Sequence, residues 1–254
     1  MIEKVQKYEF LFTELVKRDF KQKYKRTSLG MLWSILSPLL DLLVMRMVFT
    51  VFFGKDTPHY TTYLFSGLLV FNYFKESTKG GMSSLMANAK IFTKVNVPKY
   101  LFLLSKNVSA LINFGLTLVV YFAFCLMDGV SLNFRVLELL FPILCLVIFN
   151  IGIGMVLSAL FVFFRDIQYL YDIFITLLRY LSAIFYTVDK FEKYQDLFLL
   201  NPIYAYIKYF RLVMLDHVVP SLQYHGLCLL YAAVMLGIGC WFYKKYNHQF
   251  LYYV

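Results

Sequence analysis

The chain has 254 residues, of which 60% are hydrophobic and only 16% are charged, and its mean hydropathy is +0.64. Because soluble domains carry about 25% charged residues, this composition excludes an ordinary soluble domain and indicates an all-α integral membrane protein. The net charge of +10 would also suit a nucleic-acid-binding protein, so the location of the positive residues has to decide between the two.

Residues 1–29 form a basic, amphipathic segment. An apolar face recurs every fourth residue beside a parallel stripe of lysines: Phe12, Val16, Phe20 and Tyr24, with Lys17, Lys21 and Lys25. A helix of this kind lies in the headgroup layer of a membrane and does not cross it. Gly30 can take the left-handed conformation that a sharp exit from the helix needs.

Six apolar runs follow, and a transmembrane helix needs roughly 20 residues. We expect six transmembrane helices at about residues 31–53, 60–83, 100–127, 136–164, 167–187 and 221–243. They would form a transmembrane domain over residues 30–247, followed by a cytoplasmic tail at 248–254. The second run crosses the membrane only if it continues through Lys75, Glu76 and Lys79. Gly152 and Gly154 permit close helix contact in the fourth run.

Residues 188–220 are predicted to form two short re-entrant helices on the outer side. Asn201 is a good N-cap, and Pro202 is a good first helical residue, so the two helices would join at Asn201-Pro202. With six spans, most lysines and arginines fall on the side of the two termini. This asymmetry places both termini in the cytoplasm and explains the net charge without nucleic acid.

Four charged residues lie within the predicted spans, where each costs about 2.5 kcal/mol or more if it faces lipid. They are Asp41, Arg46, Asp172 and Arg179. They could form a proton relay, ion pairs between helices, or the lining of a hydrated pore. We favour ion pairing between helices, with pore lining second.

The sequence contains no nucleotide-binding or metal-binding motif. The pattern G-x-x-x-x-G-K-[ST] is absent, so this chain is not expected to be an enzyme or to bind ATP. Its four histidines and four cysteines are scattered without ligand spacing, so neither a metal site nor any other bound cofactor is predicted.

Several short motifs occur in an order and spacing that are jointly specific. They are Leu15-Val16-Lys17-Arg18-Asp19, Leu29-Gly30-Met31-Leu32-Trp33 with Pro38, Gly67-Leu68, Lys94-Val95-Asn96-Val97-Pro98, Phe163-Phe164-Arg165-Asp166-Ile167, and Asn201-Pro202 with Phe210-Arg211. Over nearly the whole chain this order resembles the ABC-2 type permeases that export cell-surface polysaccharides such as O-antigen, teichoic acid and capsule. Members often carry a proline near the outer end of span five, where this chain has Ser182-Ala183-Ile184-Phe185.

The resemblance implies a homodimer in the bacterial plasma membrane, bound to two copies of a separate ABC ATPase that holds ATP and Mg. It also implies a coupling segment at residues 84–99, which docks on the ATPase, and an outer gate. The coupling residues would be Asn88, Ile91, Phe92, Val95 and Pro98, and the gate residues Asn201, Pro202, Phe210 and Arg211. Without the resemblance, residues 84–99 would be interpreted as an ordinary basic cytoplasmic loop.

The substrate implied by the resemblance is a glycan on undecaprenyl diphosphate. Lys23, Lys25 and Arg26 precede the first span, where they could contact the diphosphate or, with equal weight, anchor to membrane lipid. Aromatic residues near the outer half could stack on sugar rings, although packing is the more common role for any one of them. The candidates are Phe49, Phe52, Phe53, Tyr60, Tyr63 and Phe71.

The leading hypothesis is therefore the permease subunit of an ATP-driven exporter that moves a lipid-linked polysaccharide from the cytoplasm to the outer face of the membrane. One alternative is a proton-coupled secondary transporter, although the inverted repeat typical of that class is not evident. Others are an ABC-2 permease for a different lipid or drug and a membrane enzyme acting on lipid-linked sugars.

Overall fold

The computed structural model describes residues 2–25, 27–53, 58–188 and 195–253, and these ranges contain helices and connections without a β-strand. The elements in chain order are α1 (Ile2–Tyr24), η1 (Gly30–Leu32), α2 (Trp33–Phe53), α3 (Tyr60–Ala87), α4 (Ala89–Phe92), α5 (Tyr100–Met127), η2 (Phe134–Leu139), α6 (Leu140–Phe163), α7 (Ile167–Leu181), α8 (Gln195–Leu199), α9 (Pro202–Met214), α10 (Leu222–Tyr246) and η4 (Gln249–Leu251). The expectation of an all-helical protein is confirmed for the described residues.

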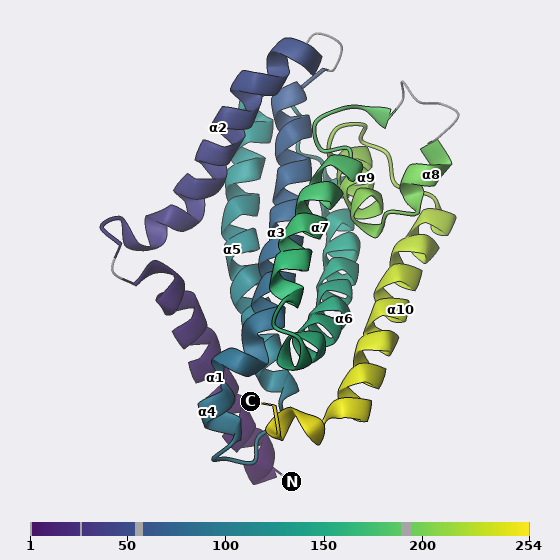
Figure 1. The fold of residues 1–254 in the computed structure, drawn as a ribbon. Helices are drawn as coiled ribbons and strands as arrows, with labels where there is room; N and C mark the ends of the chain where they lie inside the picture. Colours follow the sequence, from purple (N-terminus) through teal and green to yellow (C-terminus); the bar gives the residue numbers. More distant parts are fainter. Residues whose placement is uncertain (1, 26, 54–57, 189–194, 254) are drawn as a thin grey trace.

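Helix α3 is the centre of the bundle. It packs against α5 and α6, while α10 packs along the other side of α6 (Figure 1). The start of α1, α4 and η4 lie at one end of the bundle, and α8, α9 and the end of α7 lie at the opposite end. The two ends therefore differ in kind: one carries the amphipathic helix and both chain termini, and the other carries the short helices.

Four helical stretches are long and apolar enough to cross a membrane among the described residues: Gly30–Phe49, Tyr100–Met127, Phe134–Phe163 and Leu222–Tyr246. α3 has 28 residues but carries Lys75, Glu76 and Lys79. α7 has 15 residues, which extend about 22 Å, and this is shorter than the roughly 30 Å of a hydrocarbon core. Composition and length thus support a multi-pass protein, while the six-span count stays a prediction.

The ends of several helices differ from the sequence expectation. α3 runs on to Ala87, four residues past its expected end. α7 stops at Leu181, although its apolar run predicted residues 167–187. The Ser182 hydroxyl donates to the Leu178 carbonyl at 2.7 Å and Ala183 has a φ of 48°, so the helix cannot continue. Gly30 takes the expected left-handed conformation, with a φ of 53°.

Glycines bring α6 and α10 into backbone contact. A Cβ atom placed on Gly152 would lie 2.4 Å from the carbonyl carbon and oxygen of Met235, and one on Gly239 would lie 2.6 Å from the carbonyl oxygen of Gly152. Distances under 3 Å leave no room for a side chain. The close helix contact expected at Gly152 is therefore present, and it also requires Gly239.

Candidate functional site

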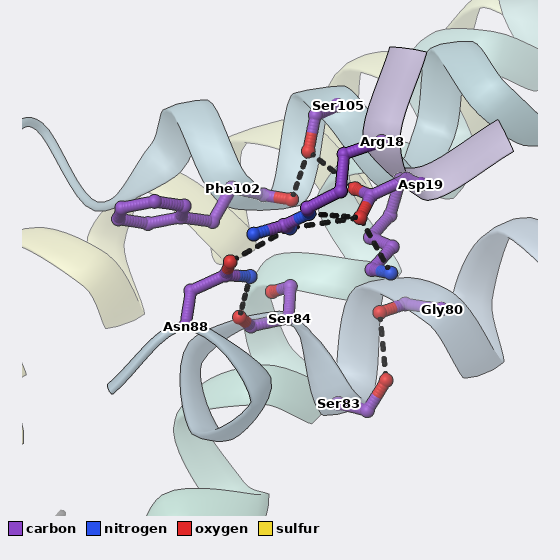
Figure 2. Close-up of polar contacts among 9 residues, drawn as sticks. Arg18, Asp19, Gly80, Ser83, Ser84, Asn88, Phe102 and Ser105 are labelled. Atoms are coloured by element: carbon purple, nitrogen blue, oxygen red, sulfur yellow. Dashed lines mark hydrogen bonds and ion pairs between the residues drawn. The ribbon is translucent and has the colours of Figure 1, made fainter. Parts of the chain in front are cut away.

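A buried carboxylate joins the amphipathic helix to the rest of the bundle. The side chain of Asp19, on α1, is 1% exposed. Its Oδ1 accepts from Arg18 Nη2 at 2.8 Å and pairs with Lys106 Nζ at 3.0 Å, while Oδ2 accepts from the Ser105 hydroxyl at 2.9 Å (Figure 2). Two cations and one hydroxyl thus offset the cost of burying this charge.

The same cluster extends into the predicted coupling segment. Arg18 Nη2 also donates to Asn88 Oδ1 at 2.8 Å, and Asn88 Nδ2 donates to the Ser84 carbonyl at 2.8 Å (Figure 2). We call these six residues the Asp19 cluster: Arg18, Asp19, Ser84, Asn88, Ser105 and Lys106. It fastens α1, the end of α3 and α5 together where α4 begins.

The five predicted coupling residues face different environments. Asn88 and Phe92 are buried, and the Phe92 ring packs against Phe102 with centroids 6.0 Å apart. Ile91 and Pro98 are half-buried, whereas Val95 is 46% exposed. Of these five, Val95 is therefore the most exposed, and the coupling role of all five stays a prediction.

The C-terminal tail belongs to this packed end. Lys99 Nζ donates to the Asn247 carbonyl and lies 5.3 Å from the centre of the Phe250 ring. Phe250 is fully buried, and it packs in one apolar cluster with Leu15 and Phe92. Burial lowers the pKa of the Lys99 ammonium.

At the opposite end of the bundle, Arg211 of α9 is buried and fastens α9 to α3 and to the turn after α7. It donates to the Tyr63 hydroxyl at 2.7 Å, the Ala183 carbonyl at 2.9 Å and the Ile184 carbonyl at 3.1 Å. A Cβ on Gly67 would lie 2.9 Å from Arg211 Nη2, so Gly67 makes room for this side chain. The buried position of Arg211 therefore requires a residue without a side chain at position 67.

Asn201 begins α9 as expected. Its side-chain oxygen accepts from the backbone N–H of Ile203 at 3.0 Å, and Pro202 is the first helical residue. Its amide group also donates to the Ser182 hydroxyl at 3.0 Å. Phe210 is fully buried. Asn201 and Arg211 therefore both attach α9 to the turn after α7, and the gate role of the four residues stays a prediction.

Arg211→Lys is expected to lower the free energy of unfolding by about 2 kcal/mol, because an ammonium group cannot reproduce the planar fork that reaches two carbonyls and a phenol. The midpoint of thermal unfolding in detergent measures the effect. Lys208→Arg, the reverse exchange on the same helix, is the control and should unfold near the wild-type temperature. Equal midpoints for Arg211→Lys and wild type would contradict the assignment.

The predicted glycan-path aromatics are mostly packed in the core. Tyr60, Tyr63 and Phe71 are buried, and the two phenols donate to the carbonyls of Phe185 and Tyr186 at 2.8 Å each. Phe49 stacks on Phe185 with centroids 4.4 Å apart. The side chains of Phe52 and Phe53 lie outside the described residues. The path assignment stays a prediction, and the burial of the three favours a packing role.

The predicted phosphate contacts are exposed where they are described. Lys23 pairs with Glu76 of α3 at 2.8 Å, Lys25 is exposed, and Arg26 lies outside the described residues. Glu76 also accepts from Asn113 of α5 at 2.6 Å, so the end of α1 is tied to two helices. A diphosphate contact stays a prediction for all three basic residues.

The four intramembrane charges do not pair with one another in the described part of the chain. Asp172 pairs instead with Lys79 at 2.7 Å, which is an ion pair between α7 and α3. Arg179 lies over the Phe71 ring, 5.5 Å from its centre. Asp41 and Arg46 are exposed on α2. The predicted ion pairing between helices is therefore present for Asp172. Its partner Lys79 lies near the end of the predicted second span.

Sequence reasoning quoted Arg18-Asp19 only as part of a motif and overlooked Ser105 and Lys106. One signal was available. Asp19 is four residues after Leu15, on the apolar face of the amphipathic helix, and an acid there needs a buried partner. Nothing in the sequence indicated which basic residue would supply it.

The helical bundle, with its four long apolar stretches and an amphipathic helix at one end, defines a multi-pass membrane protein. The chain belongs to the ABC-2 type transporter family, whose model matches residues 11–215. It is 29% identical to the O-antigen export system permease protein RfbA of Klebsiella pneumoniae, over 94% of this chain and 93% of that protein.

Two further relatives also cover nearly the whole chain. The O-antigen export system permease protein RfbA of Myxococcus xanthus is 28% identical, over 88% of this chain and 87% of its own length. The polysialic acid transport protein KpsM of Escherichia coli is 24% identical, over 92% of both chains. Similarity to each of these relatives therefore extends over most of the chain.

Proposed function

We propose that this chain is the membrane permease subunit of an ATP-driven exporter of a cell-surface polysaccharide. The observation that carries the proposal is the end-to-end similarity to permeases named for O-antigen export and polysialic acid transport, within the ABC-2 type transporter family. Family membership implies an ABC ATPase partner. The polysaccharide is proposed to cross from the cytoplasm to the outer face as a glycan on undecaprenyl diphosphate.

The proposed topology has six spans with both termini in the cytoplasm. α3 and α7 would supply the two spans beyond the four apolar stretches, with Lys79 and Asp172 paired between them. Re-entrant α8 and α9 close the outer side. The N-terminal helix and α4 would then face the cytoplasm together, which agrees with their position at one end of the bundle (Figure 1).

In the proposed assembly two copies of the chain meet in the membrane, and each binds one ATPase subunit through residues 84–99. ATP and Mg belong to that partner. The second copy is proposed to contact the apolar face of α7, whose large side chains are uncovered in the single chain: Leu170, Ile173, Phe174, Leu177 and Leu181. ATP-driven movement of the ATPase would push α4 and, through the Asp19 cluster, α1.

The function is tested in cells that lack the gene. Surface polysaccharide, detected with a lectin or antibody on intact cells, should disappear while the lipid-linked polymer accumulates inside, and the wild-type gene should restore export. Depletion of ATP should stop export. Export that survives ATP depletion but collapses with the proton gradient would refute the proposal and favour a secondary transporter.

Val95→Asp is expected to abolish co-purification with the ATPase, since it places a desolvated charge in the proposed contact while Val95 makes little contribution to the fold. The measurement is the amount of ATPase recovered with a tagged permease. Tyr252→Asp, in the exposed tail, is the matched control and should retain the ATPase. Recovery of an intact complex with Val95→Asp would count against the coupling segment.

A further inference from the structure

A cavity of about 470 Å³ lies between α2, α3 and α5, next to the end of α1. Each helix contributes one face to it: Trp33, Ser37 and Asp41 on α2, positions four apart, and Asn113 and Thr117 on α5, again four apart. The volume is within the range of roughly 300–1,000 Å³ that is typical of small-molecule sites. The cavity is thus large enough for a ligand group and is not a packing defect.

The lining changes from apolar to charged along α3. Phe65, Leu68 and Leu69 line one part, and Lys75, Glu76 and Lys79 line the other, which is the part reached by Lys23 of α1. From Leu68 to Lys79 the helix rises about 16 Å. A ligand that fits this gradient has a charged head at the α1 end and an apolar chain.

Among the described residues that line the cavity, one lysine at the α1 end has no ion-pair partner. Lys79 pairs with Asp172, and Lys23 pairs with Glu76, which is also held by Asn113. Lys75 is half-buried, lines the cavity, and forms no ion pair in the described part of the chain. A partly desolvated lysine favours an anionic ligand, and lysine commonly binds phosphate groups, to which it presents a point charge.

A second charge limits where the anion can lie. Asp41 lines the cavity on α2, about 12 Å along that helix from Trp33. Its carboxylate would repel a phosphate placed beside it, so the phosphate is confined to the end that holds Lys75. The apolar side chains beyond this point then contact the chain of the ligand.

We propose that the cavity between α2, α3 and α5 binds the diphosphate head of a polyprenyl lipid from the inner leaflet, with Lys75 as its principal contact. Lys23 and Lys79 flank the phosphate, and the first isoprene units lie along Phe65 and Leu68. The inference rests on the proposed function, because it gives the diphosphate of the substrate a place within one subunit before transport begins. It adds Lys75 to the basic residues considered from the sequence.

The test is a titration of the purified permease–ATPase complex with undecaprenyl diphosphate, read by native mass spectrometry. Lys75→Gln should weaken binding about tenfold, and Lys75→Arg should bind within about threefold of wild type. Lys244→Gln removes an exposed lysine at the end of α10 and should bind as wild type does. Unchanged binding by Lys75→Gln would overturn the proposal.

A second variant acts without changing a charge. Ser37 is exposed and lines the cavity, so Ser37→Trp should fill the space and weaken binding by a similar factor while the complex still assembles. Tight binding by Ser37→Trp would overturn the location. The unfolding midpoint of each variant is measured in the same detergent, and it should stay near that of wild type. Lys75→Arg keeps the positive charge and serves as the folded control for Lys75→Gln.

Competition separates the possible sources of the phosphate. Phosphatidylglycerol or inorganic diphosphate that displaces undecaprenyl diphosphate at equal concentration, with the same dependence on Lys75, would overturn the lipid-diphosphate assignment. Surface polysaccharide is measured in parallel. If wild-type cells export polysaccharide and Lys75→Gln binds the lipid as wild type does, only this inference is refuted. If wild-type cells export no polysaccharide, the proposed function is refuted.

Discussion

Asp19→Ala is expected to abolish export and to lower the free energy of unfolding by about 3 kcal/mol. Removing one partner of a buried ion pair costs about 3–5 kcal/mol, because the opposite charges remain without compensation. Here Arg18 is 40% exposed and Lys106 is 22% exposed, so both can turn partly toward water, and the lower end of that range applies. Surface polysaccharide and the unfolding midpoint in detergent measure the two effects.

Glu14→Ala is the control, because Glu14 lies on the same helix and forms an exposed pair with Lys17 at 2.9 Å. Exposed pairs contribute about 0–1 kcal/mol, so this variant should export normally. Asp19→Asn keeps the shape and the contact with Ser105 but loses the charge, and it should be intermediate. Wild-type export by Asp19→Ala would show that the cluster plays no part in passing movement from α4 to α1.

Gly239→Ala is expected to separate α6 from α10 and to lower the free energy of unfolding by about 3 kcal/mol or more. The added Cβ would lie 2.6 Å from the Gly152 carbonyl oxygen and 3.0 Å from the Gly152 Cα, and neither backbone atom can move without shifting a helix. Overpacking of a core costs about 1–3 kcal/mol even where side chains can adjust. The unfolding midpoint and resistance to trypsin in membranes measure the loss.

Gly237→Ala is its matched control. Gly237 is two residues away on the same helix, and a Cβ there would meet nothing within 4 Å. Because alanine is a better helix former than glycine by about 0.5–1 kcal/mol in soluble helices, this variant should be neutral or slightly more stable. Similar losses for both variants would mean that helix propensity, and not the contact between α6 and α10, sets the stability.

The sequence predicted those elements whose limits are set locally. The run at 100–127 coincides with α5 because Pro98 precedes it and Gly129, with a φ of 81°, follows it. The junction at Asn201-Pro202 was predicted correctly for the same reason, since a cap acts within two residues. Such features depend on neighbours in the chain and not on the fold.

Features fixed by distant contacts were not predictable. α7 ends early where the carbonyls of Ala183 and Ile184 accept hydrogen bonds from Arg211, which is 27 or 28 residues away. Ser105, which donates a hydrogen bond to Asp19, is 86 residues away. Hydropathy does not indicate which residues of two helices lie side by side. The sequence could therefore identify Asp19 as an unusual acid on an apolar face, but it could not indicate which groups surround it.

The candidate sites follow the same division. Motif order predicted a coupling role for residues 84–99, which stays a prediction, but only the fold separates the inward Asn88 and Phe92 from the outward Val95. The cavity was not foreseen, because it needs one face from each of three helices. For the aromatic residues, composition suggested sugar contacts, whereas packing around α3 accounts for Tyr60, Tyr63 and Phe71.

The packing of Phe250 has a practical consequence for handling the protein. A truncation that removes the last few residues would uncover the rings of Phe163 and Tyr243, and it would remove one of the two aromatic rings near the Lys99 ammonium, leaving that of Phe92. Tyr252 and Tyr253 point outward, so an affinity tag joined after them through a flexible spacer can extend into solution. Shortened expression clones ending before Phe250 should therefore yield less permease than tagged full-length ones.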